Sequence, residues 1–122
     1  MLDTVSFQGM ADIPVTFQHT GLVRGQDEGK IVKLTAVKTV GLCADDDIRW
    51  LGKVVAIDKD GVHCSVELTG ILSVTYSGSL GASQVMQLVA DASGGLKLDE
   101  TNGLYYQVVD VNTDDGVLWI VR

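Results

Sequence analysis

Apolar and polar residues alternate along much of the chain with the two-residue period that is typical of β-strands. In VHCSVELT (62–69) the apolar side chains fall at every second position, and ILSVTYS (71–77) repeats the pattern. Each run therefore predicts a strand with one apolar and one polar face. KIVKLTAV (30–37) and WLGKVVAI (50–57) are also strand-like. Because VVAI is apolar at every position, the second run predicts a central strand covered on both faces.

Two further pairs of strand-like runs predict hairpins near the C-terminus. VMQLVAD and LKLDE flank ASGG, and LYYQVVDV and VLWIV flank NTDDG. Residues 83–92 also fit a short helix, since Ser83 is a suitable cap and apolar residues recur at helical spacing. We favour the strand, because LVAD-ASGG-LKL has the pattern of a hairpin.

Turn signals rich in glycine, aspartate and asparagine separate these runs. Their density predicts an all-β fold, a small barrel or sandwich of antiparallel hairpins with an extended N-terminal segment. We find no linker and no convincing internal repeat. Residues 21–122 are expected to form a single barrel or sandwich domain, preceded by residues 1–20.

The first twenty residues carry a series of apolar side chains with no good turn signal before Gly21. Two interpretations remain open for this segment. It supplies the first strands of the barrel, or it is an arm that adds a strand to a neighbouring subunit. On the second interpretation the partner-binding residues are Leu2, Val5, Phe7, Met10, Ile13, Val15 and Phe17.

The charge balance narrows the range of partners. The 122 residues include 16 Asp and Glu against 9 Lys and Arg, which gives a formal net charge of −7. A nucleic-acid-binding protein needs a cationic surface, and an anionic membrane surface would repel this chain. We therefore expect neither partner, and the acidity suits a soluble protein or the complement of a basic protein surface. The N-terminus lacks the pattern of a signal peptide, so we expect assembly in the cytoplasm.

The DKDG sequence at 58–61 resembles the start of a calcium-binding loop. The sixth position of such a loop would be His63 instead of glycine, and the twelfth would be Thr69 instead of glutamate. We interpret DKDG as a turn between two strands. His63 and Cys64 are neighbours in a strand and point to opposite faces, so they cannot form a catalytic pair.

The remaining candidates for chemistry are weak. Asp45, Asp46 and Asp47, like Asp114 and Asp115, are expected in solvated turns. Cys43 and Cys64 lie in apolar runs and are expected to be small buried side chains, since they form no C-x-x-C pair. No G-x-S-x-G sequence anchors a triad with a histidine. The sequence therefore predicts no catalytic, cofactor-binding or metal-binding residue, and a protein that is not an enzyme.

The order of strands and turns resembles that of small head-associated proteins of tailed bacteriophages. The resemblance is carried by GKIVKLTAVKTVGLCADDDIRWLGKVVAIDKDGVHCSVELTGILSVTYSG and by LVADASGGLKL and YYQVVDVNTDDGVLWIV further along, so it covers residues 25–122. It rests on the pattern of strands and turns, not on a chemical motif, and residues 1–20 lie outside it.

The resemblance implies a β-rich capsid decoration, or cement, protein that binds the outside of the mature phage head. It implies the major capsid protein as partner, self-association into a homotrimer, and a place on the surface of the virion. It transfers no catalytic residue and no cofactor. The alternatives are another phage structural protein, of the tail or connector, and a small β-barrel that binds a ligand or glycan.

Overall fold

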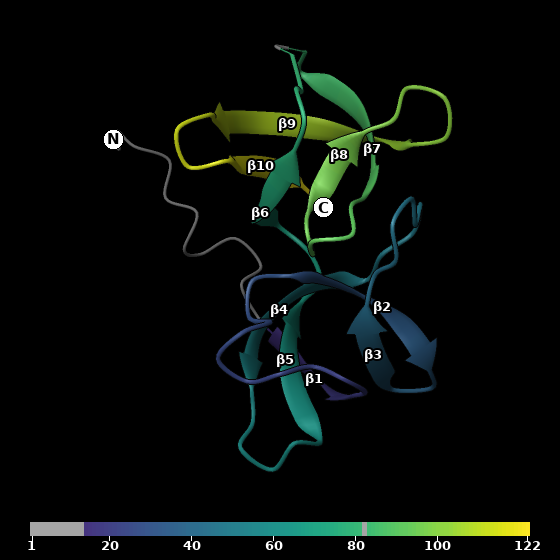
Figure 1. The fold of residues 1–122 in the computed structure, drawn as a ribbon, viewed down its shortest axis with the longest axis vertical. Helices are drawn as coiled ribbons and strands as arrows, with labels where there is room; N and C mark the ends of the chain where they lie inside the picture. Colours follow the sequence, from purple (N-terminus) through teal and green to yellow (C-terminus); the bar gives the residue numbers. More distant parts are fainter. Residues whose placement is uncertain (1–13, 82) are drawn as a thin grey trace.

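The computed structural model describes residues 14–81 and 83–122, and every regular element among them is a β-strand (Figure 1). The predicted all-β class is therefore confirmed. The strands are β1 (Pro14–His19), β2 (Ile31–Ala36), β3 (Thr39–Leu42), β4 (Gly52–Ile57), β5 (His63–Glu67), β6 (Ile71–Ser77), β7 (Val85–Ala90), β8 (Leu96–Leu98), β9 (Leu104–Asn112) and β10 (Val117–Val121).

These strands close into two barrels. The first barrel has the order β1-β3-β2-β4-β5 and the second has the order β10-β6-β8-β7-β9. In each barrel the first and third strands in chain order pair in parallel, β1 with β3 and β6 with β8, and the other pairings among these ten strands are antiparallel. The second barrel thus repeats the connectivity of the first. Where the sequence predicted one barrel or sandwich over residues 21–122, the chain builds two barrels.

The strand registers extend this equivalence to single positions. Val54 pairs with Val66 before a β-bulge, and Val108 pairs with Ile120 next to a bulge at the same place. The same offset along the chain relates Ile31 of β2 to Val85 of β7. Ile31 pairs with Lys53, the residue before Val54, and Val85 pairs with Gln107, the residue before Val108. The sequence keeps a trace of the relation in KVVAIDKDGV and QVVDVNTDDGV. Our prediction of no internal repeat is therefore wrong.

The bulge also corrects the prediction for VVAI. We expected β4 to be covered on both faces, yet Val55 is 36% exposed and Ala56 is exposed, whereas Val54 and Ile57 are buried. The extra residue in a bulge leaves the ladder and turns toward solvent, which accounts for the outward position of Val55. Val109, at the equivalent position of β9, is 46% exposed.

Both C-terminal hairpins are confirmed. β7 pairs antiparallel with β8, and β9 pairs antiparallel with β10. The helical alternative for residues 83–92 is wrong, because β7 occupies most of that range. Three consecutive residues, Leu88, Val89 and Ala90, are fully buried, a pattern that a strand covered on both faces produces.

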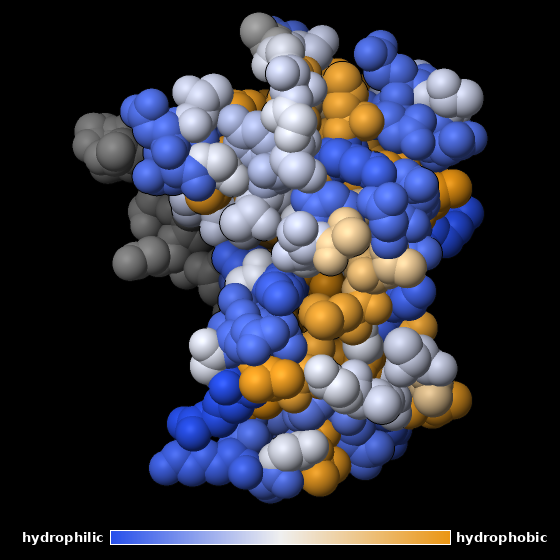
Figure 2. All heavy atoms as spheres, in the orientation of Figure 1, coloured by the Kyte–Doolittle hydropathy of each residue, from blue (hydrophilic) through white to orange (hydrophobic). Residues whose placement is uncertain are grey.

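The barrels are stacked end to end along the long axis of the molecule (Figure 1). Seven buried residues form the core of the first barrel, whereas the core of the second includes Ile31, Cys43 and Trp50, which belong to the first. Apolar side chains reach the surface at the junction and near both ends of the long axis (Figure 2). The two barrels therefore share part of one core.

Backbone hydrogen bonds also join the barrels. Asp46 N donates to Ala90 O at 2.9 Å, Ala90 N donates to Asp47 O at 2.8 Å, and Ile31 N donates to Gly94 O at 3.0 Å. The turn between β7 and β8 is thus bonded to the end of the first barrel that carries the β3–β4 loop.

Side chains complete this junction. Lys97 Nζ lies 2.7 Å from Asp45 Oδ1 and 2.8 Å from Asp46 Oδ1. The Arg122 guanidinium lies 4.2 Å from the centroid of the Trp50 ring and donates to Leu51 O at 3.0 Å. Cation–π contacts of this kind add to the apolar packing of the indole.

Candidate functional site

Most of the predicted partner-binding segment lies outside the described residues. This holds for Leu2, Val5, Phe7, Met10 and Ile13. Val15 and Phe17 are described, and both lie in β1, which pairs with β5 and β3. Phe17 packs partly against the core of the first barrel, whereas Val15 is 41% exposed. From Pro14 onward the segment is thus a barrel strand.

Two surfaces with strongly exposed apolar side chains were not predicted. On the first barrel, in β2 and the β2–β3 turn, Val37 is 88% exposed and Leu34 is 55% exposed. On the second barrel, in β7 and β9, Tyr105 is 71% exposed and Val85 is 49% exposed. Large exposed apolar side chains that lie together mark candidate contact sites. Comparing the strand registers of the two barrels points to Leu34 and Val85, because their equivalents, Leu88 and Ile31, are fully buried.

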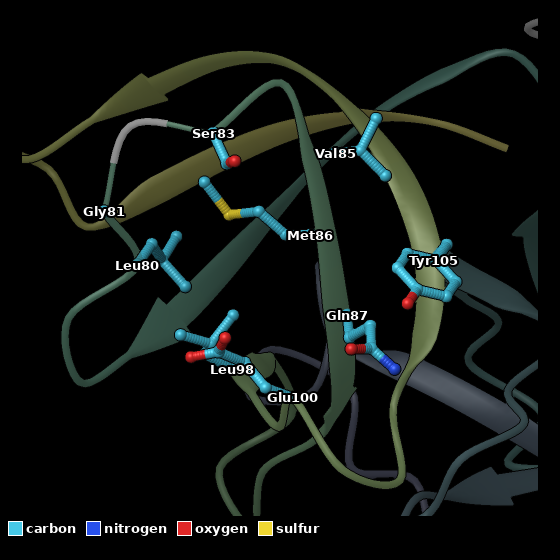
Figure 3. A pocket seen from close by; sticks show the side chains of 9 residues that line it. All are labelled: Leu80, Gly81, Ser83, Val85, Met86, Gln87, Leu98, Glu100 and Tyr105. Carbon is cyan, nitrogen blue, oxygen red and sulfur yellow. The ribbon is translucent and has the colours of Figure 1, made fainter.

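A pocket of about 390 Å³ lies on the second of these surfaces. Figure 3 shows its walls: Met86 on one side of β7, Val85 and Gln87 on the other, and Tyr105 on the neighbouring β9. Leu80 and Leu98 line the lower wall, and Glu100 adds a carboxylate. The pocket lining is therefore about as polar as it is apolar, with an acidic group and an aromatic ring at its edge.

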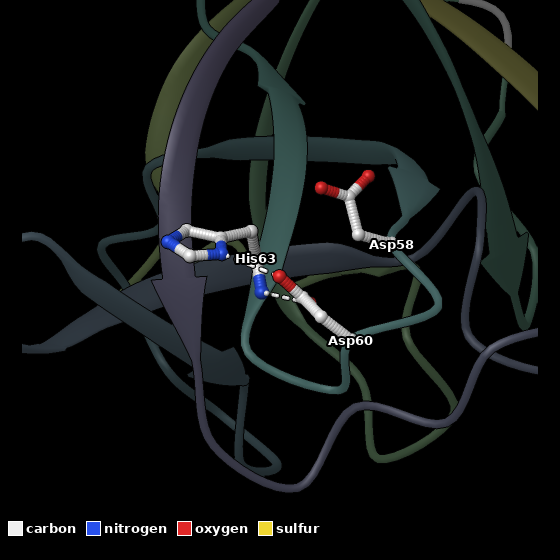
Figure 4. A group of neighbouring side chains, drawn as sticks. All are labelled: Asp58, Asp60 and His63. Carbon is white, nitrogen blue, oxygen red and sulfur yellow. Dashed lines mark hydrogen bonds and ion pairs between the residues drawn. The ribbon is translucent and has the colours of Figure 1, made fainter.

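The DKDG turn has the predicted form. It joins β4 to β5, with Asp58 N donating to His63 O at 2.9 Å. Asp60 Oδ1 accepts hydrogen bonds from Val62 N at 2.8 Å and His63 N at 3.0 Å, and Asp60 Oδ2 lies 2.7 Å from His63 Nδ1 (Figure 4). The hydrogen bond with His63, followed by those from the two backbone N–H groups, lowers the pKa of Asp60 to about 2.

The turn also has the donor set of a weak cation site. Ligand atoms of Asp58, Asp60 and His63 all lie within 4.8 Å of one another, and they are the one such group among residues 14–81 and 83–122. The Asp60 oxygens already accept hydrogen bonds within the turn, and both carboxylates are exposed. The Asp60 carboxylate therefore stabilises the conformation of the turn through these hydrogen bonds. Cys64 is 1% exposed, so it lies on the face opposite His63, as predicted.

The acidic run at 45–47 lies in a turn, as expected, but it is not simply solvated. Asp45 and Asp46 bind Lys97 of the second barrel. Asp47 accepts hydrogen bonds from Lys33 Nζ and Ala44 N, both at 2.7 Å, and these bonds lower its pKa. The sequence could not show this role, because Lys97 is far along the chain.

Two aspartates that belong to no recognisable sequence motif are buried. Asp27, 1% exposed, accepts from Lys30 Nζ at 2.8 Å and Val23 N at 2.7 Å. Burial alone would raise its pKa, but these two bonds outweigh burial and leave the pKa lowered. Asp91, 5% exposed, accepts from Ser77 Oγ and from backbone N–H groups of its own turn. Both carboxylates thus hold turns in place.

The two cysteines are free and buried, as predicted. Burial, followed by the nearby Asp47 carboxylate, raises the pKa of the Cys43 thiol to about 11. Burial also raises the pKa of Cys64. A thiol with a raised pKa is a poor nucleophile at neutral pH, so both behave as packing residues.

A scan against protein-family models, a search of curated proteins and a search of solved structures find no match to this chain. Among the residues that the structure describes, there is no helix that is long and apolar enough to cross a membrane.

Proposed function

We propose that this chain is a bacteriophage head decoration protein that binds the outside of the mature head and stabilises the shell. Its partners would be the major capsid protein and further copies of itself, in a homotrimer on the surface of the virion. The resemblance over residues 25–122 motivates the proposal. The structural observation that carries it is the exposure of large apolar side chains on both barrels, Leu34 and Val37 on the first and Val85 and Tyr105 on the second.

Such a role depends on surface complementarity. A protein that binds only the expanded shell stabilises it by mass action, because unbinding must precede any return to the unexpanded form. Many symmetric copies, each with a modest interface, add to a large total effect. An acidic chain with a formal net charge of −7 would complement basic capsid surfaces.

Cosedimentation with heads of the phage that encodes the chain tests the proposal. We expect the protein to sediment with expanded heads and to bind unexpanded procapsids at least about tenfold more weakly, a difference of roughly 1.4 kcal/mol. Equal binding to both forms, or binding to purified tails instead of heads, would contradict the proposal.

The contribution of the N-terminal segment is tested by a variant that lacks residues 1–13. The truncation ends before Pro14, because β1 pairs with β5 and its loss would open the first barrel. We expect this variant to remain folded and to lose affinity for expanded heads. If the truncated variant binds expanded heads as tightly as the wild-type protein does, the two barrels alone attach the protein to the head. Val62→Glu, at a site 44% exposed in the β4–β5 turn, is the matched control and should bind normally.

The pocket favours one alternative, a β-barrel that binds a glycan or another small ligand. Tyr105 offers an exposed ring beside the polar groups of Gln87 and Glu100. A sugar bound there would raise the melting temperature of the wild-type protein and not that of Tyr105→Ala. A sugar panel with no such shift would eliminate this alternative.

A further inference from the structure

The junction between the barrels uses different ends of two equivalent units. The first barrel contributes the end where β2 begins and where the β3–β4 loop lies, which we call the receiving end. The second barrel contributes the end that carries the β7–β8 turn, which we call the docking end. Because both barrels have both ends, residues 14–81 and 83–122 leave one receiving end uncovered, on the second barrel, and one docking end uncovered, on the first; we call these the free ends.

The free receiving end is exposed where its equivalent is buried. The strand register makes Val85 the equivalent of Ile31, and Leu104 the equivalent of Trp50. Ile31 is fully buried and Trp50 is 4% exposed, whereas Val85 is 49% and Leu104 is 38% exposed. Val85, which lines the pocket, and Leu104 thus lie where, on the first barrel, the equivalent residues are covered by the second barrel.

The free docking end shows the same contrast. Ala90 ends β7 at the junction and Ala36 is its equivalent at the end of β2. Ala90 and Leu88 are fully buried, but Ala36 is exposed and Leu34, the equivalent of Leu88, is 55% exposed. The next residue, Val37, projects from the β2–β3 turn with 88% of its surface exposed.

The charges at the free ends match those at the junction. At the junction, Lys97 of the docking barrel pairs with Asp45 and Asp46 of the receiving barrel. At the free ends, exposed Lys38 lies next to Val37 in the turn, and exposed Glu100 lies at the edge of the pocket. A cation on the docking end would again meet a carboxylate on the receiving end.

We propose that copies of this chain associate head to tail, with the β2–β3 turn of one copy seated in the pocket of the next through Val37 and Lys38 against Val85, Tyr105 and Glu100. The contact would continue between chains the stacking seen within one chain. Such an interface joins different surfaces of two copies, so it forms a ring when the rotation closes and a filament when it does not. The inference stands whether or not the chain decorates a capsid.

Sedimentation velocity of the full-length protein tests the interface. We expect the wild-type protein to associate as its concentration rises to about 100 µM. Val37→Glu and Tyr105→Glu should each weaken association by about tenfold or more, since each puts a charge into an apolar contact. Both sites are mainly exposed, so both variants should keep the fold, which circular dichroism verifies.

A mixture of the two variants gives the sharper test. Val37→Glu retains an intact pocket and Tyr105→Glu retains an intact turn, so the mixture restores one interface per pair. We expect a 1:1 dimer that grows no further, whereas a two-fold symmetric interface would stay broken in the mixture. Val62→Glu is the control and should associate like the wild type.

Other outcomes would overturn the inference. They are a wild-type monomer throughout the concentration range, variants that associate normally, or a mixture that remains monomeric. If deletion of residues 1–13 exposes a self-association that the full chain lacks, the N-terminal segment occupies the pocket instead. A sugar that binds the pocket without affecting association would likewise assign the pocket to that ligand.

Discussion

Trp50 is 4% exposed in the first barrel, while its equivalent in the second barrel, Leu104, is 38% exposed. The two positions share their register, so the difference comes from what covers them. The Trp50 ring lies 6.0 Å from that of Tyr106 of the second barrel, and the Arg122 guanidinium lies 4.2 Å from the centroid of the Trp50 ring. Equivalent positions in a duplicated fold thus become core or surface according to whether a neighbour follows in the stack.

Replacing Trp50 and Leu104 should give the largest difference in the free energy of unfolding between equivalent positions of the two barrels. Trp50→Ala is expected to cost about 3–5 kcal/mol of stability, and Leu104→Ala less than about 1 kcal/mol, because only the indole is buried. Urea unfolding checks both. In Trp50→Ala the remaining tryptophan, Trp119 in β10, reports on the second barrel. Its fluorescence should shift together with the circular dichroism, and two separate transitions would contradict a shared core.

Gly52 and Tyr106 are the next pair of equivalents. A Cβ at Gly52 would lie 2.2 Å from Glu67 O, so the first barrel has no space for a side chain there. We expect Gly52→Ala to cost about 1–3 kcal/mol through overpacking. Denaturant unfolding measures the loss, and a variant as stable as the wild type would show that β5 moves aside.

Substitutions of the turn glycines Gly61 and Gly116 should cost the same stability in the two barrels, in contrast to the pairs above. Gly61 has φ +73° and Gly116 has φ +66°, and at both glycines a Cβ would have no neighbouring atom within 4 Å. Each substitution by alanine should therefore cost about 1 kcal/mol through backbone strain alone. Unequal losses in thermal or urea unfolding would mean that the two turns are not equivalent.

The hydroxyl of Tyr106 is buried without a hydrogen-bond partner. Removing an unsatisfied polar group relieves a desolvation cost, so Tyr106→Phe should leave stability unchanged or raise it by up to about 1 kcal/mol. The ring is retained, and its packing on Trp50 with it. A clear loss of stability on urea unfolding would instead show that the hydroxyl is hydrogen-bonded in solution.

The smallest expected effect is a difference in pH dependence between the β4–β5 and β9–β10 turns. Asp60 holds the first turn with a pKa of about 2, whereas the neutral Asn112 amide accepts hydrogen bonds in the second. A lowered carboxyl pKa contributes stability above the ordinary value near 4, and this contribution is lost as pH falls through about 2.

The wild-type protein should therefore exceed Asp60→Asn in stability above about pH 4, and the difference should vanish near pH 2. Asn112→Ala should show a pH-independent loss. An NMR titration of the Asp60 carboxyl carbon measures the midpoint directly, and a midpoint near the ordinary value would refute the role of His63 and the backbone donors.

Local chemistry in the sequence was enough to predict the hairpins, the DKDG turn and the strands other than β3 and β1, since no strand-like run was predicted at β3 and residues 1–20 fit two interpretations. Period-two alternation placed Cys64 and Val66 inside, and dense glycine and aspartate signals placed the turns, because both depend on neighbouring residues. The free, buried state of both cysteines followed from the same apolar runs.

The tertiary structure alone decided how the strands group and what covers them. The repeat is not apparent in the sequence because most equivalent positions differ in residue type, and the β2–β3 and β7–β8 turns differ in length. The pairing of Lys97 with Asp45 joins residues that lie far apart along the chain. Burial of Trp50 and exposure of Tyr105 depend on the neighbouring barrel, a long-range contact that no local pattern encodes.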